Sequence, residues 1–126
     1  MTLLTRKNYP ELSNVNAPYV HAVRHHHTLY VSGLTAFGTA AQGQPLAAQA
    51  SEIFRQLHQV AAAEQISLQN LIKVTIFVTS LDELASLREV LFANFGEHLP
   101  ASSLVQISAL FSPDLNVEIE AILALK

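Results

Sequence analysis

Three consecutive histidines, His25, His26 and His27, are the first residues in this sequence whose type suggests chemistry. In an extended strand His25 and His27 would share one face about 6.6 Å apart, a separation that two ligands of one metal ion can span. His26 would point to the other face, and no Asp, Glu or Cys stands near in sequence to complete a coordination shell. If the three residues instead form a hairpin turn, they lie in solvent. We favour the turn and predict no metal site here.

Two carboxylates stand out near the C-terminus, because Glu118 and Glu120 interrupt the otherwise apolar segment VEIEAILAL. Residues two apart in a strand point to the same face. One interpretation is structural: this face borders solvent, or the carboxylates pair with Lys or Arg of another subunit. The other interpretation is functional: the pair supplies a general acid or base in an interface cleft. Both interpretations stay open on the residues alone.

Several other kinds of site have no support in the sequence. The chain has no cysteine, which excludes disulfides, thiol catalysis and cysteine-ligated zinc. It also lacks a glycine-rich dinucleotide or phosphate-binding loop and a GxSxG nucleophile elbow.

The elements that must position these residues are predicted from periodicity and turn signals. Pro45 suits the start of a helix that runs to about Gln65, and Ser80 to Glu83 reads as a capping box for a second helix that stops at Gly96. A hairpin linking the first two main strands would carry the histidines, and residues 33–44 and 111–116 are expected to be loops. The predicted strands cover residues 19–25, 28–32, 72–79, 103–109 and 117–125, with an extra strand at 2–6.

The composition sets the fold class and the surface. Mostly hairpin-linked strands with two helices indicate one α+β domain over residues 1–126, with both helices on one face of a sheet. Half of the 126 residues are hydrophobic and only 13% are charged, against about 25% in typical soluble domains. Strands that are apolar on both sides then need a partner subunit, so we predict a homo-oligomer. The net charge of −3 disfavours nucleic-acid binding, and without a membrane span or secretory segment a cytoplasmic location is expected.

Three segments, APYVHAV at 17–23, TLYVSGLTA at 28–36 and VEIEAI at 117–122, resemble the signature segments of the RidA/YjgF family, also called the endoribonuclease L-PSP or translation-inhibitor family. The stretch from NLIKVTIFVT to LFANFG and then LPASSLVQISAL resembles the family's later strands and second helix. Taken in order, the segments extend the resemblance over nearly the whole chain.

The resemblance implies a chorismate-mutase-like α+β fold and a homotrimer with small-molecule clefts between subunits. Active members of the family hydrolyse enamines and imines to 2-keto acids and ammonia, with no metal or cofactor. The family's aromatic wall residue corresponds to Tyr19, the serine of its V-S-G motif to Ser32, and the glutamate that handles water to Glu118.

One departure from the family pattern concerns the arginine that binds the substrate carboxylate. The family's P-A-R-S motif reads Pro100-Ala101-Ser102-Ser103 here, so Ser102 stands where the arginine would be. A neutral hydroxyl does not replace a bidentate guanidinium–carboxylate contact. Arg88 aligns with a second-helix asparagine of many members, and is either a solvent-facing helix residue or a relocated cation. The expected ligand-binding positions are therefore Tyr19, Ser32, Arg88, Ser102 and Ser103.

Four functions follow in order of preference. The first is a trimeric cleft protein with weak or no ordinary 2-imino-acid deaminase activity, because Ser102 replaces the arginine. The second is a working enamine or imine deaminase in which Arg88 binds the anion. The third is a metabolite-binding or regulatory trimer without chemistry. Ribonuclease activity ranks last, because the chain is acidic and has no basic groove.

Overall fold

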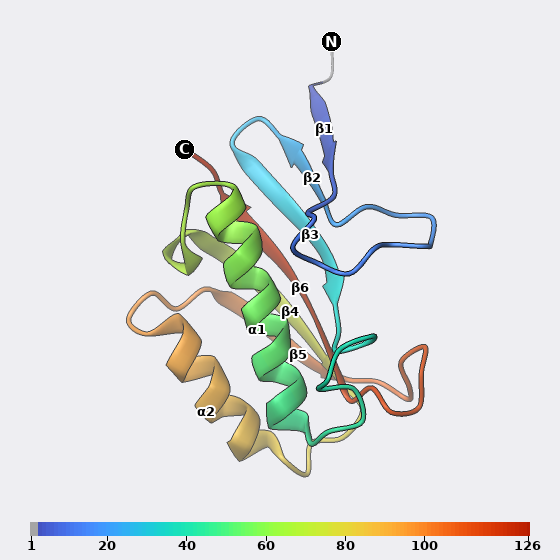
Figure 1. Ribbon diagram of the computed structural model, residues 1–126. Coiled ribbons are helices and arrows are strands. Elements are labelled where there is room, and N and C mark those ends of the chain that lie inside the picture. The colour runs from blue at the N-terminus through green and yellow to red at the C-terminus, as the bar shows by residue number, and fades with distance from the viewer. Residues whose placement is uncertain (1–2) are drawn as a thin grey trace.

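The computed structural model describes residues 3–126 and contains six strands in one sheet, two α-helices and a short 3-10 helix (Figure 1). Both α-helices lie over the same face of the sheet. The elements in chain order are β1 (Leu4–Lys7), β2 (Ala22–His25), β3 (Thr28–Leu34), α1 (Leu46–Ala63), η1 (Leu68–Asn70), β4 (Leu71–Val78), α2 (Leu84–Phe95), β5 (Ala101–Gln106) and β6 (Val117–Ala124).

The sheet is mixed and has the strand order β1-β2-β3-β6-β4-β5. All neighbouring strands are antiparallel except β4 and β5, which are parallel and are connected through α2. This arrangement confirms the predicted α+β class with two helices on one face. Strand β4 lies between two partners, β6 and β5.

Strand periodicity explains which residues form the core. Alternate residues of β6 are buried, and they face the apolar side of α1. Buried residues of β3 and β4 extend the same layer. The core residues contributed by β6 and α1 include Val117, Ile119, Ala121, Leu123, Ile53, Phe54, Leu57 and Val60.

The opposite face of the sheet carries a second set of side chains. Tyr30 pairs with Ile122 across β3 and β6, and Phe77 pairs with Glu118 across β4 and β6. Tyr30 is 47% exposed, although it is a large aromatic residue on a strand. The face away from the helices therefore carries exposed apolar side chains beside charged ones, so the prediction of strands that are apolar on both sides holds only in part.

The start of α2 differs from the prediction. The Ser80 hydroxyl accepts a hydrogen bond from the Asp82 amide, which forms a local turn. Helix α2 begins at Leu84, and Glu83 at its N-cap makes no side-chain capping bond. The predicted capping box is therefore wrong, because the serine hydroxyl bonds two residues ahead and not three. The end of α2 at Gly96, which has a φ of 58°, is as predicted.

Other boundaries shift by a few residues. Helix α1 begins after Pro45, which is its N-cap, and ends at Ala63, two residues before the predicted end. Strand β2 begins at Ala22, so the predicted strand start at Tyr19 is wrong. Strand β5 begins at Ala101 and ends at Gln106, earlier than the predicted 103–109, because its register is set by parallel pairing with β4.

The N-terminal segment is fastened to the end of α1 by a buried polar contact. The Tyr9 hydroxyl donates to Glu64 at 2.7 Å, and the Lys7 ammonium pairs with the same carboxylate. Burial favours a higher pKa for the Glu64 carboxyl, but hydrogen bonds from Lys7 and Tyr9 outweigh it and lower that pKa. This contact holds the loop between β1 and β2 in place.

Within residues 3–126, neither α-helix combines the length and apolar character needed to cross a membrane.

Candidate functional site

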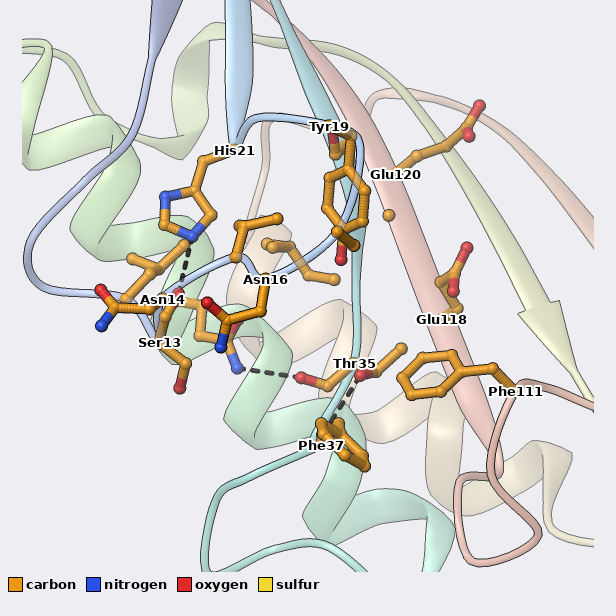
Figure 2. A pocket seen from close by; sticks show the side chains of 17 residues that line it. Ser13, Asn14, Asn16, Tyr19, His21, Thr35, Phe37, Phe111, Glu118 and Glu120 are labelled. Carbon is orange, nitrogen blue, oxygen red and sulfur yellow. Dashed lines mark hydrogen bonds between the residues drawn. The ribbon is translucent and has the colours of Figure 1, made fainter.

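A cleft of about 650 Å³ lies beside the sheet, where the loop between β1 and β2, the end of β3 and strand β6 meet. Figure 2 shows side chains from these elements arranged around it. Of the residues singled out from the sequence, Tyr19, Ser32, Glu118 and Glu120 all line this cleft. Residues far apart in the chain are thus brought to one place.

Glu118 and Glu120 both line the cleft from the same face of β6, as their spacing predicts (Figure 2). Glu118 is half-buried and Glu120 is exposed. Within residues 3–126 no hydrogen bond or ion pair reaches the Glu118 carboxylate. Burial raises the pKa of the Glu118 carboxyl, and the charge of Glu120 raises it further. The pair is therefore an unneutralised acidic wall of the cleft.

Gly33 makes the position of Glu118 possible. The pairing of β3 with β6 shifts register between Val31 and Leu34, so Ser32 and Gly33 form an irregularity in the strand. A Cβ atom added at Gly33 would lie 2.6 Å from Cδ of Glu118. A side chain at position 33 would therefore displace the Glu118 carboxylate from its present position.

The loop between β1 and β2 is held against the cleft by Ser32 and His21. The Ser32 hydroxyl donates to the Val20 carbonyl at 2.7 Å. Nδ1 of the buried His21 accepts the Tyr9 amide at 2.8 Å, which leaves Nε2 to donate to the Ser13 carbonyl at 2.9 Å. Both ring nitrogens of His21 therefore hold this loop through hydrogen bonds, and Ser32 fixes the segment that presents Tyr19.

Two exposed phenylalanines close the lower side of the cleft in the view of Figure 2. Phe37 follows β3, Phe111 precedes β6, and their rings meet edge to face with centroids 5.1 Å apart. The loops that carry them are joined by Asp114, whose carboxylate accepts two hydrogen bonds from the Gln42 amide. An apolar aromatic edge thus faces the two carboxylates.

Arg88 and Ser102 lie in a different place from the cleft. Both line a groove of about 410 Å³ between α2 and the start of β5, together with Phe92, Phe95 and Leu99. Ser102 and Arg88 are exposed. The two positions linked by the resemblance are therefore neighbours, but in one chain neither lines the cleft that contains Glu118. Ser103, the next residue along β5, lines neither the cleft nor the groove.

The histidines form the turn of the β2–β3 hairpin, as predicted. His25 is the last residue of β2, and the exposed His26 and His27 make the turn, with His26 at a φ of 56°. Arg24 Nε donates to the His26 carbonyl, and Leu125 donates its amide to the His27 carbonyl. Across residues 3–126, no three His, Cys, Asp or Glu side chains are grouped to hold a metal ion.

Replacing Glu118 by glutamine should stabilise the fold at neutral pH by about 1 kcal/mol, the scale of removing one unfavourable charge. Because the folded-state pKa is raised, the ionised carboxylate opposes folding above that pKa. The penalty disappears as the pH falls through it, so the advantage of Glu118→Gln should shrink toward acidic pH. Denaturant unfolding of both proteins between pH 4 and pH 8 measures this. Glu97→Gln, at an exposed position, is the matched control, and an advantage that grows toward acidic pH would refute the assignment.

Sequence reasoning missed the residues that shape the cleft. Gly33 carried a signal, because a glycine inside a strand pattern marks a bulge or a close approach. Phe37 and Phe111 were also recognisable, since large aromatic residues in loops rich in turn formers do not belong to the periodic core positions and so suggest a surface site. The role of His21 depends on hydrogen bonds to Tyr9 and Ser13, which no spacing in the sequence reveals.

Comparison with known proteins gives consistent matches over most of the chain. The family model described as Endoribonuclease L-PSP matches residues 11–125. Protein HMF1 of Saccharomyces cerevisiae is 30% identical over 111 residues, which cover 86% of this chain and 84% of that protein. The 2-iminobutanoate/2-iminopropanoate deaminase of Salmonella typhimurium is 31% identical over 87 residues, 67% of each chain.

Solved structures agree with these sequence matches. The crystal structure of RidA from the Antarctic bacterium Psychrobacter sp. PAMC 21119 superimposes with a TM-score of 0.80 at 32% identity, covering 89% of this chain and 92% of that one. The likeness therefore extends to the whole arrangement of sheet and helices.

Proposed function

The chain belongs to the endoribonuclease L-PSP (RidA/YjgF) family, and on that premise we propose that it binds a small metabolite in clefts between the subunits of a homotrimer, with weak or no ordinary 2-imino-acid deaminase activity. The family includes proteins named 2-iminobutanoate/2-iminopropanoate deaminases. The observation that carries the proposal is the neutral Ser102 at the position where the family has its carboxylate-binding arginine. The cleft also has no Lys or Arg among its described lining residues.

The trimer is supported by the uncovered face of the sheet. Tyr30 and Val105 on that face are 47% and 45% exposed, and burying such side chains against other copies of the chain would stabilise an assembly. A trimer would also let the groove of one subunit approach the cleft of the next. Its stoichiometry, and a cytoplasmic location, stay predictions.

The chemistry proposed for this site is hydrolysis of a C=N bond. Water adds to the imine carbon, the nitrogen leaves as ammonia, and a carbonyl group remains. Glu118 is the residue proposed to orient the water and accept its proton, because its carboxylate faces the cleft and has no other partner in the described chain. Burial raises the pKa of the Glu118 carboxyl, which is the direction expected of a general base. Tyr19 and Ser32 would contact the ligand at the walls of the cleft.

A coupled assay tests the proposal: 2-iminopropionate is generated in situ and semicarbazide competes for it. Wild type should hydrolyse little of the imine, so that most of it reacts with semicarbazide. Ser102→Arg should raise kcat/KM by about 10–100-fold, the value of one charge-assisted contact. Adding Glu118→Ala should abolish that gain. Ser86→Arg, on the exposed surface of α2, is the control for added charge and should change nothing. Efficient turnover by wild type would overturn the proposed loss of activity.

A second candidate function is supported by the position of Arg88, which lines the same groove as Ser102. A guanidinium there is placed to bind a ligand carboxylate in place of the missing arginine. If wild type is an active deaminase, Arg88→Ala should lower kcat/KM by about 10–100-fold. Arg55→Ala, which removes an arginine already paired with Glu52, should leave it unchanged. Equal activity of both variants and wild type would exclude this role.

The remaining candidates are distinguished by products. A non-catalytic metabolite-binding trimer would bind ligands without releasing ammonia from any imine. The acidic net charge of −3 and the acidic cleft disfavour ribonuclease activity.

A further inference from the structure

The walls of the cleft are negatively charged, whereas a 2-imino acid has a carboxylate and requires a positively charged partner. Its two ionisable carboxylates, Glu118 and Glu120, lie on the same face of β6. Phe77 and Thr75 are their register neighbours on β4, so strand β4 places no charge directly beside them. An anionic ligand in this cleft would meet repulsion from both glutamates.

The other polar groups of the cleft do not neutralise the glutamates. Both ring nitrogens of His21 are bonded within the protein, because Nδ1 accepts the Tyr9 amide while Nε2 faces the Ser13 carbonyl. The Ser32 hydroxyl proton is directed at the Val20 carbonyl. The Ser32 oxygen still offers lone pairs to a ligand, which suit a hydrogen-bond donor, whereas both ring nitrogens of His21 are already bonded.

The aromatic side chains complete the pattern. Tyr19 and Phe111 line the same cleft as Glu118 and Glu120, and Tyr19 lies above Phe111 in the view of Figure 2. Phe37 meets the ring of Phe111 edge to face. Aromatic faces attract cations as well as apolar groups, and carboxylates attract cations.

We propose that the cleft selects a cationic ligand, a protonated amine, iminium or amidinium group attached to an apolar or aromatic body and carrying no carboxylate. The nitrogen would bind between Glu118 and Glu120, and the apolar body would lie against Phe111 and Tyr19. This inference rests on the proposed small-molecule cleft and names its ligand class. Within the proposed chemistry, it points to amine-derived imines and away from imines of amino acids.

Binding measurements with three probes of one shape test the ligand class. Benzylamine supplies the cation, benzyl alcohol the neutral analogue and benzoate the anion, each titrated into the full-length protein by calorimetry. Benzylamine should bind at least about tenfold more tightly than benzyl alcohol, and benzoate should not bind in the cleft. Raising the salt concentration should weaken the binding of benzylamine and leave that of benzyl alcohol unchanged.

Variants then locate the site of binding. In the double variant Glu118→Gln/Glu120→Gln, benzylamine and benzyl alcohol should bind equally, whereas Glu97→Gln should keep the full preference. Phe111→Ala should weaken both probes several-fold and leave their ratio unchanged. Circular dichroism of each variant confirms that it is folded. The proposal is overturned if benzoate binds as tightly as benzylamine, or if the preference for the amine survives the double variant.

These outcomes are separate from those of the deaminase assay. Turnover of 2-iminopropionate that depends on Arg88, without any preference for the amine, would refute the cationic ligand class and support the second candidate function. A preference for the amine that depends on both glutamates, with no turnover of 2-iminopropionate, would support the ligand class and the proposed loss of ordinary activity together.

Discussion

Replacing Phe54 by alanine should lower the free energy of unfolding by about 3–5 kcal/mol. Phe54 is 1% exposed in the middle of α1, and its ring meets Phe95 of α2 edge to face with centroids 5.4 Å apart. The substitution leaves a cavity under α1 and also removes an aromatic contact between the two helices. Urea unfolding monitored by circular dichroism measures the loss.

The matched control for this substitution is Phe92→Ala. Phe92 belongs to the same helix as Phe95 but is 64% exposed, so its truncation should cost less than about 0.5 kcal/mol. Because Phe95 lines the groove with Arg88 and Ser102, Phe54→Ala should also loosen that groove. Equal losses at positions 54 and 92 would show that the helices are held together by other contacts.

Replacing Gln49 by leucine should cost about 3 kcal/mol, although leucine is more apolar and of similar size. Gln49 is fully buried in α1, and its amide donates to the carbonyls of Gln44 at 2.8 Å and Asp114 at 3.0 Å. Its carbonyl accepts the Asn116 amide at 2.9 Å. Leucine would leave these backbone groups buried without their partner, at about 1–3 kcal/mol for each unsatisfied group.

Thermal unfolding of Gln49→Leu beside Gln69→Leu checks this prediction, because Gln69 is exposed and its replacement should be nearly neutral. Gln49 also fixes the loop that carries Phe111, so Gln49→Leu should weaken ligand binding in the cleft at temperatures where the protein is still folded. A variant as stable as wild type would mean that the loop rearranges to satisfy its own backbone.

Most of the secondary structure follows from local signals that the structure preserves. The apolar periodicity from Leu46 to Ala61 predicts α1, because that face is the one buried on the sheet. The spacing of Glu118 and Glu120 predicts their shared face, because strand geometry fixes it. The hairpin at His26 is predicted since β-branched and aromatic residues flank a short polar run.

The predictions that were wrong or missing concern features that depend on contacts between distant parts of the chain. Whether the Ser80 hydroxyl caps a helix or closes a turn depends on the path of the chain leaving β4, which the local pattern does not encode. The start of β5 depends on its parallel register with β4. For the same reason, the sequence could not show that Arg88 and Ser102 share a groove apart from Glu118, because that separation is a property of the sheet order.

The position of β6 has a consequence for how the protein is made. It is the last strand in the chain, yet it lies in the middle of the sheet, between β3 and β4. In the folded sheet the strands β1–β3 are joined to β4 and β5 only through β6, so until residues 117–124 leave the ribosome the strand that joins these two groups is missing. Such late, long-range closure slows folding and lengthens the time that apolar strands are exposed to chaperones or to one another. Because both glutamates lie on β6, the carboxylates reach their cleft in the step that joins the two groups of strands.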